Sequence, residues 1–251
     1  MSISVTIMAH RKRRHFVREL ERELPGAEVV WDRKNDRWDT GRRSLLAHLD
    51  RGSDHALVVQ DDAIVCRNLV AGAAKAAEAA GERPVALYVG ALRPHQHTIK
   101  PAVLRARKTG QPWVETWGPY WGVAIILPTD QIRDVVAWGD AHDRIANYDR
   151  RIAAYYQYER DLKCWYTVPS LVDHRGVDEN PSLVPGRTGN RRAHWFIGDG
   201  DPLAIDWTLE PIAVGDVIRL RNTLTGRELA VREGSLRHRR LVARGEWEMI
   251  A

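Results

Sequence analysis

The sequence predicts an α/β fold, in which helices cover a mostly parallel sheet and a small C-terminal β appendage follows. Apolar runs rich in β-branched residues alternate with helical segments through most of the chain, an order typical of a parallel sheet. After about residue 198 the chain changes to short alternating segments separated by turn sequences such as Thr225-Gly226, which indicate hairpins. We therefore expect a main domain over residues 1–197 and a β-rich appendage over residues 198–251.

Successive apolar runs predict the strands of the main sheet. They are short, and glycine, proline or charged residues bound them, as is typical of buried strands. The first alternates between apolar and polar residues before it meets a basic helix, and the third leads directly into two acids. The expected strands cover residues 3–8, 27–31, 57–59, 85–89, 113–117, 123–127 and 165–168.

Helices are predicted between these strands from apolar residues at helical spacing and from start and stop signals. The clearest is Leu69–Ala80, an alanine-rich segment that follows Asn68 as an expected cap and stops at Gly81. Others are expected before Pro25, around Leu45, after Thr129 and over residues 147–161. The polar segments 32–43, 95–109 and 173–192 are expected to be loops.

The composition restricts the classes of protein. A formal net charge of +5 favours an anionic partner such as a nucleotide, a nucleic acid or a phosphorylated glycan. Cys66 and Cys164 fit no zinc spacing and are too few for a disulfide framework, so we expect a reduced, cytoplasmic protein. No segment approaches the roughly 18 uninterrupted apolar residues of a membrane span, so neither secretion nor membrane insertion is expected.

Two adjacent carboxylates, Asp61 and Asp62, follow the apolar strand at residues 57–59. Neighbouring carboxylates at the end of a buried strand repel each other and are costly to desolvate unless a cation or hydrogen-bond donors compensate them. A hard divalent metal would do so. The alternative of a solvated surface turn remains open at this point.

The carboxyl ends of the predicted strands deliver further polar groups to one edge of the sheet, where ligands of open α/β sheets bind. Two carboxylates and a histidine can hold Mg²⁺ or Mn²⁺, with phosphate oxygens of a ligand in the open positions. Arg42 and Arg43, expected at the start of a helix after Gly41, are placed to meet the same phosphates. Trp38 and Trp121 supply either stacking faces or core. The groups at this edge are His10, residues 32–43, Asp61, Asp62, Trp121, Gly122, Asp173 and His174.

With these motifs the sequence resembles a GT-A-type (Rossmann-like) nucleotide-sugar glycosyltransferase, in particular the small glycosyltransferases of actinobacterial phages and their hosts. The resemblance covers roughly residues 3–196. Gln60-Asp61-Asp62 stands where the family keeps its acidic motif, so the resemblance implies that Asp62 binds the metal and Asp61 lies near the nucleotide ribose. Gln60 replaces the usual first acid of that motif.

The resemblance also implies roles for residues outside the acidic motif. Arg42 and Arg43 look like the helix start that contacts the donor diphosphate, together with His10, Trp38, Trp121 and Gly122 as donor-binding residues. Asn147-Tyr148-Asp149 is similar to the late acidic motif, which makes Asp149 the catalytic base of an inverting enzyme, and His174 looks like the histidine that completes the metal shell. Ordinary surface or strand-end roles for Asp149 and His174 remain open.

The resulting hypothesis is a metal-dependent glycosyltransferase that uses Mn²⁺ or Mg²⁺ and moves a sugar from a nucleotide-diphosphate donor, a UDP-sugar, to a hydroxyl group. Two alternatives remain: a nucleotidyltransferase of similar fold that releases pyrophosphate, and a non-catalytic nucleic-acid-binding module. A phage-encoded enzyme would act in the cytoplasm of its bacterial host.

Basic residues in three segments suggest an electropositive rim around the donor site. Such a rim suits a phage or host protein, a glycan, or DNA with hydroxymethylated bases, so DNA modification is one of the functions considered. The rim residues are Arg105, Arg107, Lys108, Arg187, Arg191, Arg192 and Arg237 to Arg240.

Overall fold

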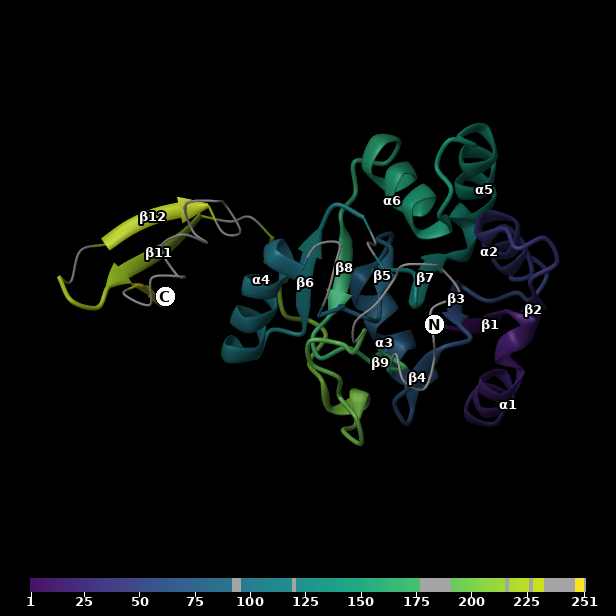
Figure 1. The fold of residues 1–251 in the computed structure, drawn as a ribbon, viewed down its shortest axis with the longest axis horizontal. Coiled ribbons are helices and arrows are strands. Elements are labelled where there is room, and N and C mark those ends of the chain that lie inside the picture. Colours follow the sequence, from purple (N-terminus) through teal and green to yellow (C-terminus); the bar gives the residue numbers. More distant parts are fainter. Residues whose placement is uncertain are drawn as a thin grey trace.

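The computed structural model describes residues 1–91, 96–118, 121–176, 191–214, 217–225, 228–232 and 247–250. These residues form an α/β body around an eight-stranded sheet, and a separate three-stranded sheet lies near the C-terminus (Figure 1). The predicted α/β class is confirmed. In the part of the chain that the structure describes, no helix is long and apolar enough to cross a membrane.

The central sheet comprises β1 (Ile3–Ala9), β2 (Glu28–Trp31), β3 (His55–Gln60), β5 (Val85–Ala86), β6 (Trp113–Thr116), β7 (Ala124–Pro128), β8 (Cys164–Thr167) and β10 (Ile212–Ala213). Its strand order is β10-β6-β8-β5-β7-β3-β1-β2. Among the described pairings, β1 is parallel to both β2 and β3, and the pairs β5–β8 and β6–β10 are also parallel. Because β7 is antiparallel to β3 and β5, and β6 is antiparallel to β8, the sheet is largely parallel but mixed.

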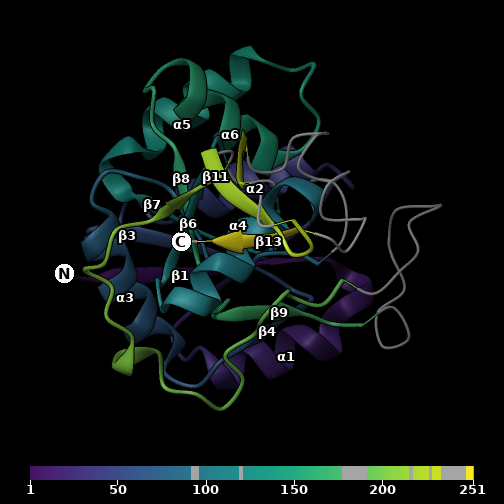
Figure 2. The ribbon, with the colours of Figure 1, turned by 90° about the vertical axis from the view of Figure 1, so that its left-hand side faces the viewer.

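Helices cover both faces of this sheet. Successive side chains of β3 point to opposite faces, and those on both faces are buried. Leu57 and Val59 belong to one core cluster, whereas Ala56 and Val58 belong to another. The first cluster includes residues of α1 (Arg14–Glu23) and α3 (Leu69–Ala80), and the second includes residues of α2 (Arg37–Leu46), α5 (Ile132–Ala141) and α6 (Tyr148–Tyr158). Figure 2 shows α5 and α6 on one side of the strands and α1 on the other.

Two helices differ from their predictions. Residues 32–43 were expected to be a loop, but α2 begins at Arg37 because the Asp36 side chain caps its first turn, accepting hydrogen bonds from the backbone of Trp38 and Asp39. Residues 95–109 were also expected to be irregular, but α4 (Gln96–Thr109) is a helix with Pro101 inside it. By contrast, the predicted bounds of α3, Leu69–Ala80, are confirmed, although Asn68 at its start is in the left-handed conformation and its side chain makes no capping hydrogen bond.

A two-stranded sheet stands beside the main one. Its strands are β4 (Ala63–Val65) and β9 (Val172–His174), which pair antiparallel, with Ala63 opposite His174. Since β3 passes into β4 through the turn at Asp61 and Asp62, this pairing brings the late His174 next to the two acids.

The packed body extends beyond residue 197, the predicted end of the main domain. β10 pairs with β6, and the buried Trp207 accepts a hydrogen bond from Trp113 Nε1 through its backbone oxygen. The separate sheet has the order β12-β11-β13, formed by β11 (Val217–Asn222), β12 (Glu228–Arg232) and β13 (Trp247–Ile250), and Figure 1 shows β11 and β12 beyond α4. The strand expected at 236–243 lies outside the described residues.

Candidate functional site

Asp61 and Asp62 lie in the turn between β3 and β4, at the carboxyl end of the parallel strands β1 and β3. Backbone hydrogen bonds fix this turn, from Gln60 N to Val123 O (2.8 Å) and from Asp61 N to Met8 O (3.1 Å). The two acids are only 3% and 2% exposed. This burial excludes the alternative of a solvated surface turn.

Arg13 compensates both carboxylates, and sequence reasoning missed it. Its Nη1 donates to Asp61 Oδ1 at 2.9 Å and lies 2.6 Å from Asp62 Oδ2. The second oxygen of Asp61 accepts a hydrogen bond from the backbone N of His10 at 2.6 Å. Burial, followed by the charge of Asp62, raises the pKa of Asp61, while Arg13 opposes this shift. Arg13 follows His10 by three residues, at the end of β1 beside the acid-bearing strand, but Arg11 and Lys12 occupy the same basic run, so nothing in the sequence singles Arg13 out.

His174 approaches Asp62 from β9, with its Nε2 at 3.2 Å from Asp62 Oδ2. The other ring nitrogen, Nδ1, lies 2.7 Å from the backbone oxygen of Arg175. A carbonyl oxygen only accepts hydrogen bonds, so Nδ1 carries a proton, and the neutral ring has its lone pair on Nε2. That lone pair then faces a carboxylate, an arrangement that is favourable only with a second proton or a metal ion between the two groups.

Asp62 and His174 fit a divalent metal as two of its ligands. Neighbouring ligands around an octahedral Mg²⁺ with bonds of about 2.1 Å are roughly 3 Å apart, close to the 3.2 Å between Asp62 Oδ2 and His174 Nε2. Fixing the remote ring nitrogen on a backbone carbonyl is the usual support of a metal-binding histidine. Within the described residues, no group of three or more histidine, cysteine, aspartate or glutamate side chains forms a complete metal cage. A metal at this position would therefore need ligand phosphates and water to complete its shell.

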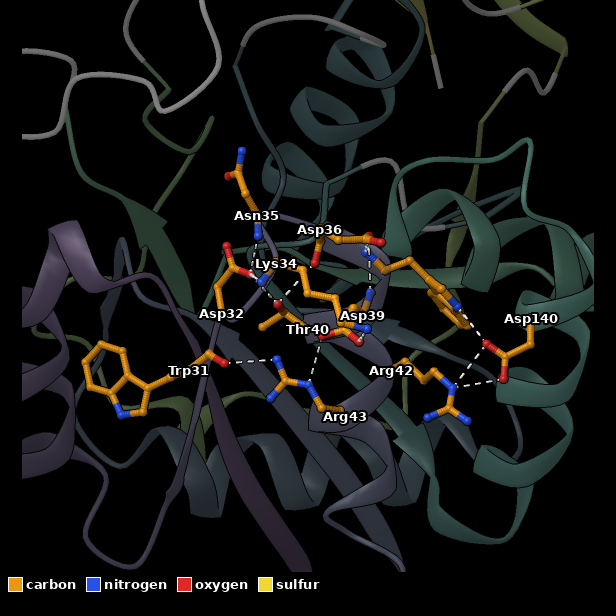
Figure 3. A network of polar contacts seen from close by, with 11 residues as sticks. Trp31, Asp32, Lys34, Asn35, Asp36, Asp39, Thr40, Arg42, Arg43 and Asp140 are labelled. Carbon is orange, nitrogen blue, oxygen red and sulfur yellow. Dashed lines mark hydrogen bonds and ion pairs between the residues drawn. The ribbon is translucent and has the colours of Figure 1, made fainter.

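The end of β2 adds Asp32 to the same edge. His10 Nε2 lies 3.9 Å from Asp32 Oδ2. Asp32 Oδ1 also accepts hydrogen bonds from the backbone of Lys34 and Asn35 and from Thr40 Oγ1, and these contacts order the loop before α2 (Figure 3). The structure thus brings His10, Asp32, Asp61, Asp62 and His174 together, as expected of the strand ends, and adds Arg13.

Arg42 and Arg43 occupy a different place from the one expected. Both lie inside α2 rather than at its start, so the free N–H groups of a helix terminus are not beside them. Arg42 Nε pairs with Asp140 of α5 at 2.9 Å, while Arg43 Nε pairs with Asp39 at 3.0 Å and its Nη2 donates to Trp31 O at 2.9 Å (Figure 3). The helix-terminus argument for donor binding by these arginines is therefore wrong.

Trp38 belongs to the core. It is 6% exposed, and its Nε1 donates to Asp140 Oδ1 at 2.8 Å. The guanidinium of Arg151 lies 4.6 Å from the ring centre, and Gly139 packs so closely that a Cβ there would meet the indole. No face of the indole is open for the expected stacking on a donor.

Trp121 and Gly122 adjoin the site through tyrosines. Trp121 is half-buried, and Tyr88 and Tyr166 meet it edge-on at 6.2 and 6.0 Å between ring centres. The ring of Tyr88 lies 6.3 Å from that of His174, so aromatic contacts link Trp121 to the metal-ligand candidate. Gly122 accepts a hydrogen bond from the hydroxyl of the buried Tyr148 through its backbone oxygen.

Asp149 stands in the first turn of α6, half-buried, and its Oδ1 accepts a hydrogen bond from the backbone N of Arg150 at 2.8 Å. Its neighbour Tyr148 also hydrogen-bonds the side chain of Gln60, the residue before the two acids. Burial raises the pKa of Tyr148 well above its ordinary value, and the charges of Asp149 and Asp62 add to this shift. Tyr148 therefore lies within electrostatic range of both the base candidate and the metal-ligand candidate.

Asp173, the neighbour of His174, anchors the segment that returns toward the site. Its Oδ1 accepts a hydrogen bond from Ala193 N at 2.6 Å, and its Oδ2 pairs with Arg192 Nη1 at 3.1 Å. The hydroxyl of Tyr88 donates to Arg191 O beside it. This places Arg191 and Arg192 close to the candidate site, as the rim hypothesis requires. The rim residues Arg187 and Arg237 to Arg240 lie outside the described residues.

A groove of about 780 Å³ lies at the opposite end of β3. Its lining includes Asp54, His55, Gly81 and Gln131, and it contains none of the predicted site residues. The chemistry of the carboxyl edge, rather than the size of this groove, identifies the candidate site.

No protein-family model matches the chain, and no curated protein matches it. Among solved structures, it is similar to mannose-1-phosphate geranyltransferase from Thermus thermophilus, with 13% identity and a TM-score of 0.34 over 65% of this chain and 58% of that one. It is also similar to A197 from STIV, with 15% identity and a TM-score of 0.40 over 78% of this chain and 96% of that one. At these identities and TM-scores, neither similarity says anything about the activity of this chain.

Proposed function

We propose that this protein is a transferase that acts on nucleotide-diphosphate donors, and more specifically a metal-dependent glycosyltransferase. It would move a sugar from a nucleotide-diphosphate sugar, a UDP-sugar in the first instance, to a hydroxyl group of its acceptor. The metal would be Mn²⁺ or Mg²⁺, and its chemistry would be to stabilise negative charge on the leaving diphosphate.

The observation that carries this proposal is the approach of His174 to Asp62. Two ligand atoms at 3.2 Å, one of them on a histidine whose other nitrogen is fixed, support a site for a hard cation. The site lies at the carboxyl edge of parallel strands, where α/β proteins bind nucleotides. The described residues supply only two such ligands, Asp62 and His174, and this favours a metal that is shared with phosphate oxygens.

Each residue of this edge has a proposed task. Asp62 and His174 hold the metal, while Asp61, His10 and Asp32 bind the nucleoside part of the donor. Trp121 and Gly122 would border the sugar. Arg42, Arg43 and Trp38 are left out because they face other protein groups.

Asp149 would act as the general base. The acceptor oxygen attacks the anomeric carbon, the bond between that carbon and the phosphate oxygen breaks, and the nucleoside diphosphate leaves with the bonding electrons. The acceptor proton passes to the carboxylate of Asp149, as is expected of an inverting transferase. Asp149 directly follows Tyr148, whose side chain hydrogen-bonds that of Gln60 beside the two acids, and this placement supports the proposed role of Asp149.

The test is a panel of nucleotide sugars incubated with the full-length protein and Mn²⁺, with the released product identified by mass spectrometry. Release of a nucleoside diphosphate supports the proposal. Release of pyrophosphate from a nucleoside triphosphate and a sugar phosphate would establish a nucleotidyltransferase instead. If neither product forms and the Asp62→Ala variant binds nucleic acid as the wild type does, the protein is a non-catalytic binding module.

The acceptor class follows from the fate of a labelled sugar. Label that becomes soluble on protease treatment indicates a phage or host protein, and label released by a glycosidase indicates a glycan. Nuclease-sensitive label indicates DNA with hydroxymethylated bases. In that last case binding to duplex should fall by on the order of a hundredfold or more between 50 and 200 mM salt if about six phosphates are neutralised.

A further inference from the structure

Arg13 contacts both acids, and on Asp62 it contacts the same carboxylate oxygen that faces His174. It comes from η1 (Arg11–Arg13), the turn directly after β1, and its side chain is 11% exposed. A single nitrogen, Nη1, contacts a carboxylate oxygen of Asp61 at 2.9 Å and one of Asp62 at 2.6 Å. The acid pair is therefore already partly compensated without a metal.

Arg13 alone does not balance the two acids. The two buried carboxylates share its one guanidinium, so this group of three side chains has a net negative charge when both acids are ionised. The Nε of Arg13 has no hydrogen-bond partner among the described residues, although it is buried. A guanidinium with an unused buried donor is not held in a fully satisfied structural network.

Arg13 and a metal would compete for the same atom. Asp62 Oδ2 is the oxygen that Arg13 contacts at 2.6 Å and that faces His174 Nε2 at 3.2 Å. A divalent cation between Asp62 and His174 would therefore stand within a few ångströms of the guanidinium, and like charges at that distance repel. The two negative phosphates of a donor would remove this repulsion, because they can bind the metal and the guanidinium together.

We propose, on the basis of the function proposed above, that Arg13 is a displaceable counter-cation of the acid pair, which makes metal binding conditional on the donor diphosphate. Without nucleotide, Arg13 occupies the carboxylates and keeps Mn²⁺ affinity low. With a nucleoside diphosphate, the guanidinium turns to the phosphates and leaves Asp62 to the metal. Arg13 is thus a positioning residue that couples the binding of metal and donor.

A purely structural role predicts a different result. If Arg13 only neutralises the acids, its removal lowers stability and leaves the intrinsic affinity for a metal unchanged or weaker. If Arg13 competes with the metal, its removal also destabilises the protein, but the affinity for Mn²⁺ rises because no guanidinium contacts the carboxylates any longer.

The experiment is a titration of Mn²⁺ into the full-length protein without nucleotide, followed by the electron paramagnetic resonance signal of free Mn²⁺. Arg13→Gln should bind Mn²⁺ about tenfold or more tightly than the wild type, and Arg13→Lys, which keeps a cation, should fall between them. Arg14→Gln is the matched control, because it removes the same charge from the adjacent, exposed residue and should leave the affinity unchanged. An affinity of Arg13→Gln that equals or falls below that of the wild type overturns the proposal.

A second titration needs no variant and stays informative if Arg13→Gln does not fold. In the wild type, saturating UDP should tighten Mn²⁺ binding by about tenfold or more, after correction for Mn²⁺ held by UDP in the absence of protein. Equal affinities with and without UDP, together with metal-dependent sugar transfer, overturn this inference and leave the proposed function standing. Absence of Mn²⁺ binding under both conditions overturns both.

Discussion

Two clusters of arginines and carboxylates in this molecule differ in burial and in charge balance. The acid-pair cluster (Asp61, Asp62, Arg13 and His174) is buried, and two carboxylates share one guanidinium. In the α2 cluster (Trp38, Asp39, Arg42, Arg43 and Asp140), each arginine has a carboxylate of its own, and the Arg42 side chain is 39% exposed. Unbalanced buried charge requires a further cation or a proton, whereas balanced, partly exposed pairs require neither. Charge balance, rather than the number of charged residues, therefore separates a candidate site from a structural network.

The largest expected effect concerns the base that would act beside the acid-pair cluster. Asp149→Asn should lower turnover by roughly two to four orders of magnitude, the usual cost of losing a general base, while donor affinity changes little. Steady-state kinetics with the accepted donor, together with a separate measurement of donor binding, check this. A collapse of donor affinity at unchanged turnover would make Asp149 a binding residue.

Trp38 tests whether the α2 cluster is structural. Because this indole is 6% exposed and packs against Gly139 and Arg151, Trp38→Ala should lower the free energy of unfolding by about 3–5 kcal/mol. Donor affinity of the folded fraction should not change. Urea unfolding and a donor-binding assay decide whether Trp38 is a core residue or a donor-binding residue. Unchanged stability with weaker donor binding would mean that the indole stacks on the donor.

His48 extends the comparison to a buried polar group that is satisfied without charge. Its Nδ1 lies 2.6 Å from Ser4 Oγ and its Nε2 lies 3.0 Å from Thr6 Oγ1. Burial, with a smaller contribution from Arg51, lowers the pKa of His48 from 6.5 to about 4. Below pH 6.5 the imidazole of His48 is therefore protonated in the unfolded chain but stays neutral in the folded chain. The free energy of unfolding falls as the pH decreases toward 4.

His48→Gln removes this titration while an amide remains to hydrogen-bond the hydroxyls. The wild type should lose about 3 kcal/mol more of its unfolding free energy than the variant between pH 6.5 and 4. Urea unfolding at a series of pH values measures both curves, and the titration of all other groups is common to them. Parallel curves would mean that His48 is protonated in the folded protein.

The smallest expected effect is in the α2 cluster. Arg42→Gln breaks an exposed pair with Asp140 and should change the free energy of unfolding by less than about 1 kcal/mol. Donor affinity should stay within about twofold, because Arg42 already faces a protein carboxylate. Isothermal titration with the donor checks this. A loss of donor affinity of tenfold or more would mean that Arg42 binds the donor.

Much of the fold followed from local patterns. The helix at Leu69–Ala80 was predictable because alanine and a stop glycine act within a few residues. Asp61 and Asp62 stood out because acids at the end of an apolar strand are costly to bury. The expected convergence of strand ends and the resemblance to a family both brought His174 to the same edge as Asp62. Neither predicted the pairing of β4 with β9 that sets the contact, because these strands are more than a hundred positions apart in sequence.

Other features depended on tertiary structure or on signals that were misinterpreted. In α4 the buried residues Ile99, Ala102, Val103 and Ala106 have helical spacing, but Pro101 and the surrounding charges suggested a loop. Arg13 could not be separated from its neighbours, because Arg11 and Lys12 carry the same charge and are exposed. Only the turn after β1 directs Arg13 inward.

The most direct test of a metal–diphosphate site at the acid-pair cluster compares Asp62→Asn with Asp140→Asn in the α2 cluster. Nucleoside diphosphate release from the accepted donor is measured in EDTA and then with excess Mn²⁺. We expect EDTA to abolish release by the wild type and Mn²⁺ to restore it in the wild type and in Asp140→Asn, whereas Asp62→Asn stays inactive. Full release in EDTA, or by Asp62→Asn, would contradict the account.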